Sequence, residues 1–136
     1  MAKAAFENTI TPMLCVRNAA GAIEWYKRAL GAEEVLRLSD GARVSHCELR
    51  IGEAVLMIAD EFPEINVLGP LSIGGSPVIL LLEVDDVDTV FAKAVAAGAT
   101  STRHVDGDSL RNGKLSDPYG HHWMIMTRSE AGPEMA

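Results

Sequence analysis

Positive charge is scarce in this sequence, and so is cysteine. Aspartate and glutamate together number 19 against 12 lysines and arginines, which gives a formal net charge of −7. Because a negative surface repels nucleic acid and anionic membranes, we expect neither as a partner. The two cysteines, Cys15 and Cys47, show no CxxC spacing. We therefore expect them to be small buried residues of a protein in a reducing compartment, without a reactive thiolate.

Long apolar runs and several common catalytic motifs are also absent. The run "VILLLEV" at 78–84 is far too short to span a bilayer, and residues 1–10 contain no apolar stretch typical of a secretory signal. These absences predict a cytoplasmic protein. The segment "GPLSIGGSP" at 69–77 lacks the lysine of a phosphate-binding loop, and no GxSxG sequence supports serine hydrolysis.

The sequence does contain one pattern written twice. Each copy has a strand-forming segment, an amphipathic helical segment and then three strand-like segments. Asn18 is placed to cap the first helix and Gly31 to end it, while Asp85 and Asp86 begin the second helix and Gly98 ends it. The first copy predicts strands at 11–16, 33–39, 43–51 and 54–59 with a helix at 18–32, and the second predicts strands at 76–84, 100–105, 109–116 and 121–127 with a helix at 85–99.

Duplicated βαβββ modules of this kind predict an α+β fold. In such a fold each sheet is backed by one helix, and we expect the open faces of the two sheets to meet around a shared cleft. The predicted organisation is a first module at 8–60, a Gly- and Pro-rich linker at 61–75, a second module at 76–128 and a flexible tail at 129–136, all within one domain.

Several segments in order resemble a known family. The paired modules, "ITPMLCVRNAAGAIEWYKRALGAEEV" at 10–35 and "DPYGHHW" at 117–123 resemble the vicinal oxygen chelate superfamily of glyoxalase I, bleomycin-resistance proteins and extradiol dioxygenases. Within it, "HCELRIGEAVLMIADEFPE" at 46–64 and "GGSPVILLLEVDDVDTVFAKAVAAGAT" at 74–100 are similar to the PhnB-like branch. The resemblance implies the fold above and a homodimer whose cleft is shared between subunits.

Two departures from the family pattern bear on function. The metal enzymes of the superfamily hold their ligands on the first and last strands of each module, and a hard divalent metal needs oxygen or imidazole donors. In this chain the metal positions fall on Thr11, Met57, Ile79 and Met124, none of which is His, Glu or Gln. The resemblance therefore implies no metal at these positions.

The second departure lies before the last turn. Close relatives carry Gln-aromatic-Trp-Gly-Asp-Arg in that segment, where this chain reads "DGDSLR" and keeps only Arg111.

The adjacent histidines His121 and His122 cannot share one metal ion, because neighbouring residues of a strand point to opposite faces. We expect His121 to hydrogen-bond around the turn at 117–120. His122 belongs to the face of the last strand that is turned away from the helix, whereas Trp123 and Ile125 belong to the face that packs against it.

The strand at 43–51 places His46, Glu48 and Arg50 together on its helix-free face. These residues either orient a ligand or form a base–carboxylate pair, or they are an ordinary charged set at a solvated edge. With His122, the residues His46 and Glu48 are also the candidates for catalysis or for a relocated metal site.

The remaining cleft-facing residues are mostly apolar, with an unusual share of methionine, which makes adaptable walls. Glu83 is the one acid among these wall residues, and we expect it to pair with Arg111 or Arg50 or to meet a cationic ligand. The predicted ligand-binding residues are Met13, His46, Glu48, Met57, Ile79, Leu81, Glu83, Arg111, His122, Met124 and Met126.

These features predict a protein that holds a small apolar or aromatic molecule in a cleft, without metal and without turning it over. The alternative is a metal-dependent lyase, isomerase or dioxygenase of the same superfamily, with a divalent metal at a relocated site built around His46, Glu48 and His122. A third interpretation is a dimeric accessory protein whose cleft is vestigial. The sequence leaves open both the ligand and whether the protein is an enzyme.

Overall fold

The computed structural model describes residues 10–128, so the predicted tail at 129–136 lies outside the described residues. The chain divides into two compact units, Met1–Gly74 and Gly75–Ala136. Each unit contains one four-stranded sheet and a long helix, which confirms the predicted α+β fold with two modules. The shared cleft between the modules stays a prediction. None of the helices among the described residues is long and apolar enough to cross a membrane.

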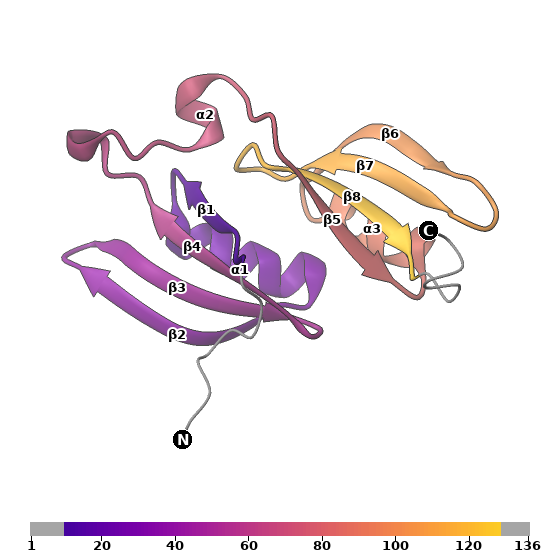
Figure 1. Cartoon of the computed structure of the whole chain (residues 1–136), viewed down its shortest axis with the longest axis horizontal. Helices are drawn as coiled ribbons and strands as arrows, with labels where there is room; N and C mark the ends of the chain where they lie inside the picture. The colour runs from indigo at the N-terminus through magenta and orange to yellow at the C-terminus, as the bar shows by residue number, and fades with distance from the viewer. Residues whose placement is uncertain (1–9, 129–136) are drawn as a thin grey trace. The chain divides into compact units, whose positions relative to one another are not determined.

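The first unit contains a sheet with strand order β1-β4-β3-β2, in which β1 runs parallel to β4 and the other pairs are antiparallel (Figure 1). Helix α1 connects β1 to β2 and covers one face of this sheet. Two short helices, η1 and α2, follow β4 in the segment predicted as a linker. The elements are β1 (Met13–Val16), α1 (Ala19–Leu30), β2 (Glu33–Asp40), β3 (Arg43–Ile51), β4 (Ala54–Asp60), the 3-10 helix η1 (Pro63–Ile65) and α2 (Pro70–Ile73).

The second unit repeats this topology with strand order β5-β8-β7-β6, where β5 and β8 are parallel. Helix α3 takes the place that α1 has in the first unit (Figure 1). The same connectivity in both units is the duplication that the sequence predicts. The elements are β5 (Ile79–Val84), α3 (Val87–Ala96), β6 (Thr100–Asp106), β7 (Asn112–Ser116) and β8 (His122–Thr127).

The predicted caps fix the start and the end of α1. The Asn18 side chain accepts a hydrogen bond from the Gly21 backbone N–H at 3.2 Å, and Gly31 ends the helix at a φ of 71°, which favours glycine. Asp60 at the end of β4 adds a tertiary clamp. Its carboxylate accepts from the backbone N–H of Ala19 at 2.8 Å and of Val44 at 2.7 Å, which ties the helix start to β3.

Trp25 and Tyr26 are adjacent on α1, and both side chains are buried. Their rings form an edge-to-face pair with centroids 5.3 Å apart, an arrangement that favours aromatic contacts.

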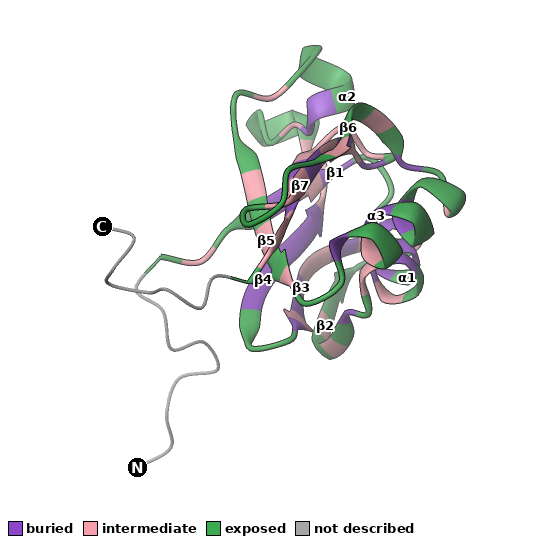
Figure 2. Ribbon diagram, turned by 90° about the vertical axis from the view of Figure 1, so that its right-hand side faces the viewer, coloured by how far each residue is buried: buried purple, intermediate pink, exposed green. Residues whose placement is uncertain are grey.

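The core of the second unit lies between α3 and the faces of β7 and β8 that pack against it. Trp123 and Ile125 are buried on β8, as the alternation predicts, and Phe91 is buried on α3. Figure 2 colours the buried stretches of the strands and helices purple. Gly113 on β7 allows this close packing. A Cβ added there would lie 2.8 Å from Phe91 Cε2 and 2.9 Å from Val105 Cγ2.

Candidate functional site

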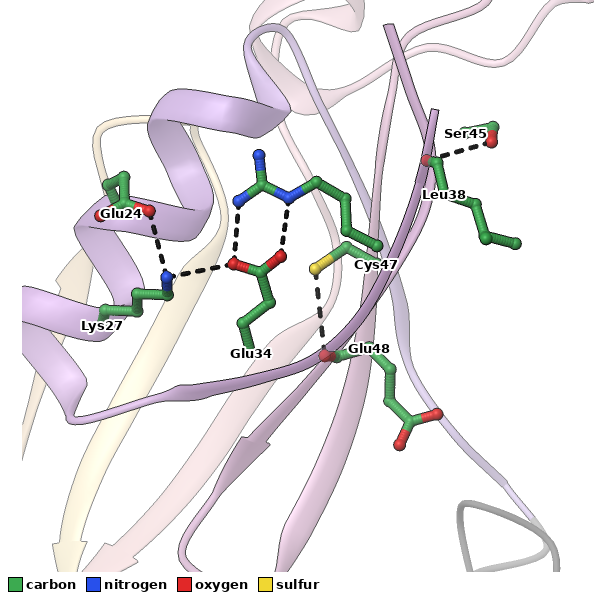
Figure 3. A network of polar contacts seen from close by, with 8 residues as sticks. Glu24, Lys27, Glu34, Leu38, Ser45, Cys47 and Glu48 are labelled. Carbon is green, nitrogen blue, oxygen red and sulfur yellow. Dashed lines mark hydrogen bonds and ion pairs between the residues drawn. The ribbon is translucent and has the colours of Figure 1, made fainter. Parts of the chain in front are cut away.

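The helix-free face of the first sheet carries the polar residues singled out on β3. In the antiparallel ladders, Glu48 lies between Leu36 of β2 and Met57 of β4, and Met57 pairs in turn with Met13 of β1. Side chains alternate along a strand, and Cys47 faces α1. Glu48, the next residue, therefore points to the face of the sheet that is turned away from α1. Figure 3 shows the Glu48 carboxylate on the opposite side of β3 from α1.

The charges on the helix side of this sheet are paired. The Lys27 ammonium lies 3.2 Å from Glu24 and 3.0 Å from Glu34, and Glu34 accepts two hydrogen bonds from Arg37 at 2.8 and 2.9 Å (Figure 3). The Arg37 guanidinium, followed by the Lys27 ammonium, holds the pKa of Glu34 below its usual value. None of these cations reaches Glu48.

Glu48 is buried to an exposure of 2%, yet its Oε2 atom has no hydrogen-bond partner among the described residues. A buried carboxylate oxygen without a donor is costly, and nearly all such groups in folded proteins are paired. Glu48 therefore has an unused capacity to accept a hydrogen bond on the helix-free face.

The row of residues around Glu48 is apolar. Met57 is buried, whereas Leu36 and Met13 at the two edges of the sheet are exposed by 45% and 58%. The centre of this face is thus buried and its margins are open. The row combines one acid with apolar side chains on both sides.

His46 and Arg50 share this face and are half-buried. Within residues 10–128, no hydrogen bond or ion pair joins either of them to the Glu48 carboxylate. The base–carboxylate pair that the spacing allows is therefore not formed. His46 and Glu48 belong to the first unit and His122 to the second, so their assembly into one site stays a prediction.

The helix-free face of the second sheet is built around His122. In the ladders, His122 lies between Ile79 of β5 and Ser116 of β7, and the His122 Nδ1 atom forms a hydrogen bond of 2.8 Å with the Ser116 hydroxyl. In the next row, Met124 lies between Leu81 and Lys114. The Nε2 side of the imidazole is left for other contacts.

A pocket of about 270 Å³ opens beside His122. The sequence prediction included only His122 and Ile79 from its lining and missed Lys114 and Thr102. Pairing with Met124 places Lys114 on this face, so alternation could have found it. Thr102 lies at a register shift between β6 and β7, where alternation fails. The lining residues are Ser76, Pro77, Ile79, Thr102, Lys114, Leu115, His122 and Trp123.

Arg111, one of the partners predicted for Glu83, binds other residues instead. The Arg111 guanidinium binds Asp88 of α3 through two hydrogen bonds of 2.8 and 2.9 Å and donates a third to the Gly107 carbonyl at 2.9 Å. Arg111 stands just before β7, where it reaches the helix. Glu83 is exposed on β5, as are Ile79 and Leu81.

The turn between β7 and β8 confirms the structural role predicted for His121. The Asp117 carboxylate, which is 4% exposed, accepts from the backbone N–H groups of Tyr119 at 2.9 Å and His121 at 3.0 Å. It also accepts from Trp123 Nε1 at 2.9 Å, and the Asp117 N–H donates to the His121 carbonyl at 2.8 Å. Asp117 thus fixes the turn that delivers His122 to the pocket.

Both cysteines are free thiols, Cys47 buried and Cys15 half-buried. Burial raises the pKa of each thiol to about 11, and the nearby Glu61 and Asp60 carboxylates contribute to the rise at Cys15. At neutral pH such thiols are almost entirely protonated. This agrees with the expectation that neither is a reactive thiolate.

The four positions that correspond to the superfamily's metal ligands do not fit a divalent metal ion. Thioethers and an isoleucine offer no hard donor, and one threonine hydroxyl does not make a ligand set. Within the described part of the chain, no three His, Cys, Asp or Glu side chains gather into a group that could hold a metal ion. The positions are Thr11, Met57, Ile79 and Met124.

Comparison with known proteins agrees with this architecture. The chain is 39% identical over 127 residues to the uncharacterised protein Rv0887c of Mycobacterium tuberculosis, a match that covers 88% of this chain and 74% of that protein. The crystal structure of TioX from Micromonospora sp. ML1 superposes with a TM-score of 0.70 at 23% identity, covering 89% of this chain and 98% of TioX.

A PhnB protein from Bacillus cereus likewise superposes with a TM-score of 0.70 at 20% identity, covering 89% of this chain and 100% of that one. At these identities the two solved structures establish the fold alone. A family model matches residues 9–125. The chain therefore belongs to the Glyoxalase/Bleomycin resistance protein/Dioxygenase superfamily.

Proposed function

We propose that this protein binds a small apolar or aromatic molecule that carries an anionic group, and that the pocket beside His122 is its binding site. The observation that carries the proposal is the lining of this pocket, in which apolar surfaces surround a lysine and a histidine. A concave apolar surface with a few convergent polar groups is the usual form of a small-molecule site. Its volume of about 270 Å³ suits a ligand of one ring.

The polar groups of the pocket favour an oxyanion. The Lys114 ammonium has three donors, and no carboxylate of the described residues pairs with it. His122 is oriented by its hydrogen bond to Ser116, which leaves Nε2 for a ligand. Ile79 and Pro77 supply apolar wall, so a carboxylate on an aromatic ring matches both parts of the pocket.

Titration with benzoate tests the proposal. The six methionines give distinct reporters when their methyl groups are labelled with ¹³C, and Met124 is the cross-strand partner of Lys114. We expect benzoate to shift the Met124 methyl signal saturably. The uncharged analogue benzyl alcohol should bind about tenfold more weakly, because it lacks the charge-assisted hydrogen bonds.

The matched pair of variants is Lys114→Met and Lys93→Met, since Lys93 is an exposed lysine on α3. Lys114→Met should weaken benzoate binding by about tenfold, and Lys93→Met should leave it unchanged. Equal binding by wild type and Lys114→Met, or shifts spread evenly over all six methionines, would contradict a specific site.

The other parts of the function remain proposals of the same kind. The donor chemistry of the residues at the four ligand positions supports binding without metal. Thermal unfolding with Ni²⁺, Co²⁺, Zn²⁺, Mn²⁺ or Fe²⁺, each against a chelator, tests this. A metal at about a hundred times its dissociation constant would stabilise the fold by about 2.7 kcal/mol. We expect no such rise in the unfolding temperature. A rise that disappears in His46→Ala would instead support the relocated metal site and an enzyme.

The homodimer typical of the superfamily is likewise proposed for this chain, with the ligand cleft as the reason for association. Light scattering coupled to size-exclusion chromatography measures the molar mass, for which a chain of 14.6 kDa sets the unit. A monomer at high protein concentration would remove dimerisation from the proposal while leaving the pocket untouched.

A further inference from the structure

The most unusual polar group outside the pocket is the carboxylate of Glu48 on the first sheet. It combines an exposure of 2% with an Oε2 atom that no described residue pairs. We propose that Glu48 anchors a second recognition site, for a cationic group with N–H donors, such as an amidinium or a primary ammonium, on an apolar or aromatic body. This site belongs to the first unit and does not rest on the function proposed for the pocket in the second.

The positions of the neighbouring cations argue that residues 10–128 do not supply the partner of Glu48. Arg50 and His46 lie two residues away on the same strand face, about 6.5 Å along the strand, a distance that an arginine side chain can bridge. Yet neither forms an ion pair or hydrogen bond with Glu48 within the described residues. Lys27 and Glu34 lie on the α1 side of the sheet (Figure 3), and Glu34 forms ion pairs with both Lys27 and Arg37.

The chemistry of the carboxylate defines the ligand group. An ionised carboxylate only accepts hydrogen bonds, so its partner must donate, and a donor that also carries positive charge forms the stronger bond. The gain is largest where the surroundings are apolar, because a low local dielectric strengthens the attraction. The acidic balance of the chain, with its net charge of −7, adds a weaker attraction for cations.

The residues beside Glu48 define the body of the ligand. Met57 and Leu36 flank it in the ladder, and Met13 continues the row to an exposed edge. Methionine sulfur makes favourable contacts with aromatic rings and adapts to irregular shapes. An aromatic amidinium therefore matches both the acid and its neighbours.

Benzamidine is the probe, because it joins an aromatic ring to an amidinium with parallel N–H donors. In the same ¹³C-methionine spectra, Met57 and Met13 report on the first sheet and Met124 and Met126 on the second. We expect benzamidine to shift the Met57 signal saturably, and the neutral isostere benzamide to bind about tenfold more weakly to the wild-type protein. This comparison needs no variant.

Variants then assign the effect to Glu48. Glu48→Gln should weaken benzamidine binding by about tenfold or more, whereas Glu33→Gln should not change it, because Glu33 is an exposed acid of the same sheet opposite Arg50. Unchanged binding by Glu48→Gln, equal affinities for benzamide and benzamidine, or shifts confined to Met124 would each overturn the proposal. Loss of the benzoate response with the benzamidine response intact would overturn only the function proposed for the pocket.

Discussion

Two buried carboxylates of this chain are treated in opposite ways by the fold. Asp117 is 4% exposed and accepts hydrogen bonds from Tyr119, His121 and Trp123. Glu48 is 2% exposed, and its Oε2 accepts none from the described residues. Burial alone therefore does not separate a structural acid from one available to a ligand. The two acids differ instead in how many hydrogen-bond donors the fold directs at the carboxylate.

The local sequence explains the contrast. Asp117 begins a turn, where the backbone N–H groups of the following residues converge on its short side chain. Trp123, the second residue of β8, adds a third donor through its indole N–H. Glu48 lies mid-strand, where the backbone donors are used by the ladder and only side chains can serve it. A longer acid in that position can be satisfied only by a neighbour or by a bound molecule.

The largest effect is expected from removing the satisfied carboxylate. Asp117→Ala leaves three donors without their acceptor, one of them the buried indole N–H, and loosens the turn before His122. We expect a loss of about 3–5 kcal/mol in the free energy of unfolding, measured by urea denaturation. Asp85→Ala is the control, since Asp85 is exposed and its ion pair with Arg128 is loose at 3.4 Å. A loss below about 1 kcal/mol, the size of one ordinary hydrogen bond, would show that the hydrogen bonds of Asp117 do not stabilise the fold as expected.

A smaller effect of opposite sign is expected at the other carboxylate. Glu48→Met replaces a buried acid, whose Oε2 has no partner among the described residues, with an apolar side chain of similar length beside Met57 and Leu36. We expect the free energy of unfolding to rise by about 1–3 kcal/mol in the absence of ligand. Urea denaturation of wild type, Glu48→Met and Glu33→Met measures it. Destabilisation by Glu48→Met alone would show that the acid is held by contacts that stabilise the fold.

Much of this arrangement can be predicted from the sequence, because it depends on local rules. The period-two alternation places Glu48 and His122 on helix-free faces, and the capping residues Asn18 and Gly31 mark the limits of the first helix. The turn role of His121 also follows from its place after a Pro/Gly pair. Each of these predictions needs only residues close together in the chain.

The sequence does not reveal features that depend on which distant residue a side chain reaches. Arg111 binds Asp88, 23 positions away on α3, although Glu83 and the arginine were an equally plausible pair by charge. The irregular register of β6 hides Thr102 from any alternation rule. The lack of a partner for Glu48 among the described residues is of the same kind, because several cations lie near it in the sequence and the structure directs none of them to its carboxylate.

The smallest effect is a difference in the alkylation rate of the two cysteines, which lie on opposite faces of the first sheet. Cys15 is half-buried, and Cys47 is fully buried beside Glu48 on the side of α1. Because burial raises the pKa of the Cys15 thiol to about 11, its thiolate fraction, and with it its rate of alkylation by iodoacetamide, should rise about tenfold per pH unit between about pH 8 and pH 10. Mass spectrometry of tryptic peptides should show Cys15 modified first and Cys47 only when the fold opens. Equal rates at the two residues would mean that the α1 side of the sheet admits solvent as readily as the helix-free side, so the packing of α1 against β3 would not hold in solution.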